Sequence, residues 1–123
     1  MKAGQTLLLV DAQPSVRKVT RTVAAREGLR LLEADDGQEG LDLARAEVPD
    51  LVLIRRDSPV LDALSVTVLL KQAEATRSIP VVVLCAEATA LDVEHYHDAG
   101  VDDYILLPLT EHNLLEKLET WLP

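Results

Sequence analysis

Short apolar runs alternate with longer amphipathic stretches along the whole chain. A continuous apolar run is typical of a strand that is buried on both faces of a parallel sheet, whereas apolar residues three or four positions apart indicate a helix. The pattern predicts strands at residues 6–10, 29–33, 51–54, 80–84 and 104–107. It predicts a helix that starts at Pro14 and is closed by Gly28, and another between the Asp36-Gly37 turn and Pro49-Asp50. Further helices are predicted from about 63 to 74, from about 88 to 99, and after residue 110.

Helix-end signals support these boundaries. Pro14 stands where the first turn of a helix tolerates proline, and Thr110 can cap the last helix. Gly28 and Gly100 follow the last residues of two predicted helices, where a left-handed glycine commonly ends a helix.

Strands that alternate with helices predict an α/β fold with a parallel sheet covered on both faces. The chain shows no internal repeat and no linker, so residues 1–123 are expected to form a single domain. In open parallel sheets, ligands bind beyond the carboxyl ends of the strands. The side chains expected at these ends are Asp11, Arg55, Cys85 and Leu107.

Composition narrows the function classes. A formal charge of −9 argues against general nucleic-acid binding, which needs a clustered cationic surface. The single cysteine cannot form an internal disulfide, and no apolar run approaches the length of a membrane span. We therefore expect a cytoplasmic protein that binds neither nucleic acid nor membrane. The basic residues Arg17, Lys18, Arg21 and Arg26 gather on the first helix, where a solvated face is the favoured interpretation.

Five segments appear in a characteristic order and spacing: LLVD at 8–11, DDGQEGL at 35–41, PDLVLI at 49–54, IPVVVL at 79–84 and AGVDDY at 99–104. Together they resemble the receiver domain of bacterial two-component response regulators, and the resemblance covers essentially the whole chain. It implies the flavodoxin-like fold of the chemotaxis response regulator, a doubly wound (βα)5 domain with strand order 2-1-3-4-5.

The resemblance also implies a chemistry, namely phosphoryl transfer from a phosphohistidine to an aspartate with the help of Mg²⁺. Asp11 matches part of the family's acidic metal-binding set, but its neighbour Ala12 offers no ligand. Arg55 occupies the position of the nucleophilic aspartate, and its guanidinium stays protonated. Cys85 and Leu107 stand where the family has a hydroxyl and a lysine.

These departures predict a pseudo-receiver that lacks the phosphoacceptor and the Mg²⁺ site, with no metal or other cofactor. Asp11 and Arg55 should lie at adjacent strand ends, and we favour a salt bridge between them over an Arg55 that points into solvent. A displaced phosphoacceptor, such as Asp57, is the alternative. An enzyme on the same scaffold is a third hypothesis, but the chain has no glycine-rich phosphate loop and no nucleophile with an adjacent base.

The expected function is a signalling module of a two-component or phosphorelay-type pathway that acts through protein–protein contact. Its partner would be a kinase, another regulator or a second copy of itself, as in a homodimer. Candidate surface residues are Val68 and Leu69 on an unusually apolar third helix, and Tyr96 and Tyr104 near the fifth strand. Deeper burial of the third helix is the competing explanation for its apolar excess.

Overall fold

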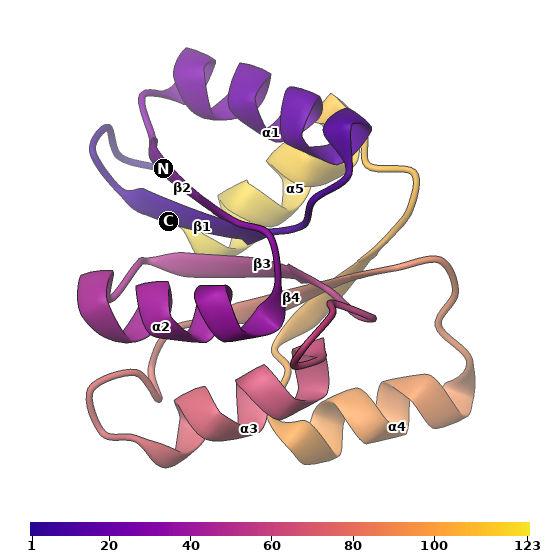
Figure 1. The fold of residues 1–123 in the computed structure, drawn as a ribbon. Coiled ribbons are helices and arrows are strands. Elements are labelled where there is room, and N and C mark those ends of the chain that lie inside the picture. Colours follow the sequence, from indigo (N-terminus) through magenta and orange to yellow (C-terminus); the bar gives the residue numbers. More distant parts are fainter.

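The computed structural model describes all 123 residues and contains one sheet with helices on both faces (Figure 1). The five parallel strands have the order β2-β1-β3-β4-β5. The elements are β1 (Thr6–Val10), α1 (Pro14–Glu27), β2 (Arg30–Ala34), α2 (Gly37–Glu47), β3 (Leu51–Arg55), α3 (Ala63–Gln72), β4 (Val81–Cys85), α4 (Ala90–Ala99), β5 (Asp103–Leu106) and α5 (Glu111–Trp121). The predicted (βα)5 fold and its strand order are therefore confirmed.

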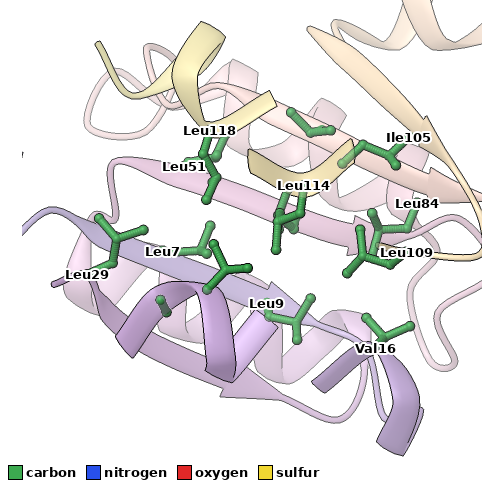
Figure 2. Close-up of a cluster of buried hydrophobic side chains, with 14 of the residues drawn as sticks. Leu7, Leu9, Val16, Leu29, Leu51, Leu84, Ile105, Leu109, Leu114 and Leu118 are labelled. Atoms are coloured by element: carbon green, nitrogen blue, oxygen red, sulfur yellow. The ribbon is translucent and has the colours of Figure 1, made fainter. Parts of the chain in front are cut away.

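Two apolar clusters, one on each face of the sheet, form the core. Successive side chains of a strand point to opposite faces. Leu7 and Leu9 of β1 therefore pack under α1 and α5 (Figure 2), whereas Leu8 and Val10 pack against α2 and its neighbours. The four side chains have no exposed surface, which explains why the strand is an uninterrupted apolar run. No helix of the chain is both long enough and apolar enough to cross a membrane.

Two of the strands that carry the site end one residue later than the sequence pattern predicted, whereas β5 ends one residue earlier, at Leu106. β3 continues to Arg55, because this residue still pairs with Leu84 of β4. β4 likewise continues to Cys85, which pairs with Leu106 of β5. Ladder hydrogen bonds therefore fix the backbones of Arg55 and Cys85, so their side chains extend from rigid strand ends and not from mobile loops.

The helix ends use the predicted signals. Gly28 and Gly100 adopt left-handed conformations with φ of 69° and 92°. Thr110 begins α5 with a reciprocal capping box, in which its hydroxyl accepts from the backbone N–H of Asn113 at 3.0 Å. The third helix is shorter than predicted and ends at Gln72, because the next residue is extended.

A partly buried carboxylate joins α5 to the edge strand β5. Asp103 Oδ2 accepts from Trp121 Nε1 and Lys117 Nζ, each at 2.9 Å. Burial acts to raise the pKa of Asp103, but the bonds from Trp121, Lys117 and the Tyr104 backbone outweigh it and hold the pKa below its ordinary value. The carboxylate therefore stays charged and holds the last helix against the sheet.

Candidate functional site

The carboxyl ends of β1, β3, β4 and β5 bring the predicted site residues to one edge of the sheet. Val10 and Ile54 are partners in the β1–β3 ladder, so Asp11 and Arg55, which follow them, leave adjacent strands side by side. The two remaining strand ends place Cys85 and Leu107 along the same edge, and both contribute to a cavity beside Arg55.

Asp11 is a buried carboxylate with two partners. It is 2% exposed, and its Oδ1 accepts from the backbone N–H of Gln13 at 2.8 Å. Its Oδ2 accepts from Arg55 Nη1 at 3.2 Å. The structure thus brings Asp11 and Arg55 together in a charge-assisted hydrogen bond.

Arg55 joins this buried carboxylate to the surface. Its side chain is 29% exposed, and its Nε lies 3.4 Å from Oδ1 of Asp57, whose side chain is 80% exposed. Ser58 fixes the loop between them, since its hydroxyl donates to the Arg55 carbonyl at 2.7 Å. The Arg55 guanidinium therefore contacts both Asp11 and Asp57, the two carboxylates that the sequence analysis named as site residues.

The side chains here do not fit a magnesium ion. Magnesium requires several oxygen ligands in strict octahedral geometry. Asp11 is paired with a cation, Ala12 has no side-chain ligand atom, and Asp57 is largely exposed and pairs with the same guanidinium. No group of three or more His, Cys, Asp or Glu side chains in the chain is arranged to hold a metal.

Cys85 is a buried thiol at the end of β4. It is 4% exposed, and its Sγ lies 3.8 Å from the Ile105 carbonyl. Burial raises the pKa of the Cys85 thiol, so the group is neutral at physiological pH and a weak nucleophile. Leu107, partly buried against the cluster under α1 and α5, adds no charge.

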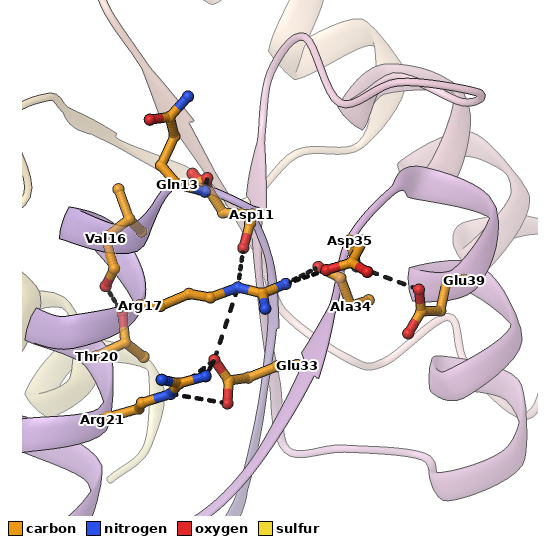
Figure 3. A network of polar contacts seen from close by, with 10 residues as sticks. All are labelled: Asp11, Gln13, Val16, Arg17, Thr20, Arg21, Glu33, Ala34, Asp35 and Glu39. Atoms are coloured by element: carbon orange, nitrogen blue, oxygen red, sulfur yellow. Dashed lines mark hydrogen bonds and ion pairs between the residues drawn. The ribbon is translucent and has the colours of Figure 1, made fainter.

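Arg17 is a residue of this region that the sequence pattern missed. Its Nε donates to the Asp11 carbonyl at 2.7 Å, and its Nη2 donates to the Ala34 carbonyl at 3.2 Å and pairs with Asp35 (Figure 3). Arg21 and Arg26 also form ion pairs within the chain, with Glu33 and Glu111 respectively. The prediction of a merely solvated basic face is therefore wrong for Arg17, whose backbone acceptors cannot be identified from sequence spacing.

The structure corrects part of the candidate interaction surface. Tyr96 is only 3% exposed, because it lies on the inner face of α4, with its ring 6.1 Å from that of Tyr104. Tyr104 and Leu69 are partly buried against the same cluster. Val68, at 38% exposure, is thus the clearest exposed member of the predicted surface, and burial explains much of the apolar excess of α3.

Val60, in the loop between β3 and α3, has an unfavourable backbone conformation. Its φ is 71°, a left-handed value that strongly disfavours a β-branched residue, and its side chain is 74% exposed. Nothing in the core compensates for this strain.

Replacing Val60 with asparagine is expected to raise the free energy of unfolding by about 1 kcal/mol, because asparagine tolerates this conformation. Urea denaturation measures the change. The matched control is Val68→Asn, which replaces an exposed valine with ordinary helical geometry and should give no such gain. Equal or lower stability of the Val60 variant would show that the loop relieves the strain in another way.

Known proteins with this architecture identify its family. The family model for the response regulator receiver domain matches residues 7–119. A curated relative, the polar-differentiation response regulator DivK of Brucella ovis, is 30% identical over 118 residues, which cover 96% of each chain.

Solved structures agree with this assignment. The receiver domain of the sensor histidine kinase PA1611 from Pseudomonas aeruginosa PAO1 superposes with a TM-score of 0.86 at 31% identity, covering 98% of each chain; it has a magnesium ion coordinated in its active-site cleft. The chemotaxis protein CheY4 of Vibrio cholerae gives a TM-score of 0.89 at 20% identity, over 97% of this chain and 99% of the other, and supports the fold alone. Because the family model matches most of the chain and DivK is 30% identical to it, this chain belongs to the response regulator receiver domain family of two-component signalling.

Proposed function

We propose that this receiver domain is a pseudo-receiver, which signals through protein contact without being phosphorylated on the family's aspartate position. The observation that carries the proposal is Arg55, which stands at the end of β3 and binds the buried carboxylate of Asp11 at 3.2 Å. A guanidinium has no lone pair available for attack on phosphorus, because it stays protonated and acts only as a donor.

The guanidinium supplies a positive charge beside Asp11, which a bound metal ion would otherwise have to supply. Two unit charges about 4 Å apart attract by roughly 4 kcal/mol at an effective dielectric constant of about 20, before the cost of desolvation is subtracted. This attraction is permanent, whereas a bound cation exchanges with solvent. The pocket is therefore held in one state, and partner binding would set the conformation of the outer surface.

The partners that fit this proposal are other signalling proteins, namely a kinase, another regulator or a second copy of the chain, in the cytoplasm. The domain would bring no enzymatic activity of its own. Its exposed features include Val68 of α3 and Lys18 of α1.

The test is exposure of the purified protein to acetyl phosphate and Mg²⁺, followed by intact-mass measurement. We expect no phosphoryl adduct, and no saturable NMR shifts around Asp11 and Asp57 when Mg²⁺ and beryllofluoride are added. An acceptor-competent receiver treated in parallel shows that the reagent is active. An adduct on the wild-type protein that disappears in Asp57→Asn would contradict the proposal and establish the displaced phosphoacceptor.

A further inference from the structure

Arg56, the residue after Arg55, is a cation without a partner carboxylate. It forms no ion pair within the chain, although its backbone is fixed on two sides. Its N–H donates to the Leu84 carbonyl of β4 at 2.8 Å, and its carbonyl accepts from the N–H of Ala63, at the start of α3, at 3.1 Å. The side chain therefore extends from a rigid point, and a contact other than an ion pair determines where it lies.

That contact is the ring of Tyr96 in α4. The central carbon of the Arg56 guanidinium lies 5.7 Å from the centre of the ring, within the distance at which an aromatic face attracts a cation. The contact is shielded from water, because Arg56 Nε and Tyr96 Oη are both buried. Such an attraction is stronger where it is desolvated, as it is here.

Tyr96 is the side chain through which α4 reaches the core. It is 3% exposed and belongs to the apolar cluster on the face of the sheet that α2, α3 and α4 cover (Figure 1). Its ring centre lies 6.1 Å from that of Tyr104 on the edge strand β5. Every other residue of α4 is exposed or only partly buried, so whatever keeps Tyr96 inward also keeps the helix in place.

This inward position carries a polar cost. Arg56 Nε and Tyr96 Oη are the two buried side-chain nitrogen and oxygen atoms of the chain that have no hydrogen-bond partner. The Cys85 thiol is close enough to influence the hydroxyl, but the pair does not meet hydrogen-bond geometry. Burial of an unpaired donor costs free energy, so both groups would gain hydration if α4 moved outward. The attraction between ring and cation helps to offset that cost.

We propose that Arg56 is a positioning residue for α4, and that its guanidinium holds the helix against the sheet by keeping the Tyr96 ring inward. Because Arg56 directly follows Arg55, the ion pair at the strand end and the outward-facing helix are attached to neighbouring residues. The inference deepens the proposed function and rests on it in one respect, that partner binding and not a phosphoryl group sets the position of α4.

The experiment is amide hydrogen exchange of ¹⁵N-labelled protein, which measures how often each helix opens. Arg56→Met keeps a long apolar side chain but removes the cation. The α4 amides should then exchange about fivefold faster than in the wild type, whereas the α1 amides should keep their wild-type rates. Arg56→Lys retains a cation and should restore the α4 rates to within about twofold of the wild type.

Two changes at Tyr96 test the other side of the contact. Tyr96→Phe keeps the ring and removes an unpaired hydroxyl, so the α4 amides should exchange about fivefold more slowly than in the wild type. Tyr96→Leu keeps an apolar side chain without an aromatic face. The ring should shift the side-chain proton resonances of Arg56 upfield in the wild type, and Tyr96→Leu should abolish this shift, which a merely space-filling Arg56 would not show.

The matched control is Arg77→Met, which makes the same change at an exposed residue before β4, at the opposite end of the sheet. It should leave the α4 rates unchanged. Wild-type α4 rates in Arg56→Met, or equal acceleration in Arg56→Met and Arg56→Lys, would overturn the inference, because the cation would then not hold the helix. Equal acceleration in all helices would also overturn it, as a general loss of stability. Failure of the proposed function is seen separately, as a phosphoryl adduct in the mass measurement.

Discussion

Replacing Arg55 with alanine is expected to lower the free energy of unfolding by about 2 kcal/mol at neutral pH. The Asp11 side chain has no exposed surface, so loss of its counter-charge leaves a carboxylate buried without ionic compensation. Removing one member of a fully buried pair commonly costs about 3–5 kcal/mol, and we expect less here because Arg55 is partly solvated. Urea denaturation monitored by circular dichroism measures the loss.

A double-mutant cycle attributes the effect to the pair. Asp11→Asn together with Arg55→Ala should be more stable than the sum of the single changes predicts, because a neutral amide needs no counter-charge. The matched control is Arg45→Ala, which removes an exposed arginine that forms no ion pair and should change stability by less than about 0.5 kcal/mol. Additive single and double losses would show that Arg55 stabilises the domain by some route other than Asp11.

Replacing Gly37 with alanine is expected to destabilise the domain by about 3 kcal/mol or more. A Cβ at this position would lie 1.7 Å from the Leu61 carbonyl oxygen, which belongs to backbone and cannot rotate away. The Gly37 N–H also donates to the Pro59 carbonyl at 3.0 Å, so the start of α2 touches the loop that follows the site. The thermal midpoint and the urea midpoint should both fall.

The neighbouring substitution Gln38→Ala supplies the control. Gln38 is exposed on the same first turn of α2, and alanine there should leave stability within about 0.5 kcal/mol of the wild type. A normal urea midpoint for the Gly37 variant would mean that the two backbone segments move apart at little cost. In that case the loop after β3 would be independent of α2.

The fold could be predicted because the three inner strands, β1, β3 and β4, are buried on both faces. Runs such as Leu7–Val10 and Val81–Leu84 must then be apolar throughout, and they stand out from the amphipathic helices between them. The positions of the strand ends were predicted less accurately. Arg55 belongs to β3 through a ladder partner on β4, and such a pairing between distant segments leaves no local mark in the sequence.

The site could be predicted only where chain order alone determines proximity. Asp11 follows β1 and Arg55 is the last residue of β3, and these two strands pair with each other, so their contact follows from the topology. Tyr96 could not be assigned to the interior, because α4 is polar overall and a single inward residue produces no periodic signal.

The shallow attachment of α4 has a mechanical consequence. Tyr96 is the only buried residue of this helix, whereas α1 and α2 each bury four. A helix that buries a single side chain should unfold locally at a lower free-energy cost than a helix that buries four. Because Tyr96 also lines the cavity beside Arg55, the strand ends of the site and the outward-facing helix share this one buried residue.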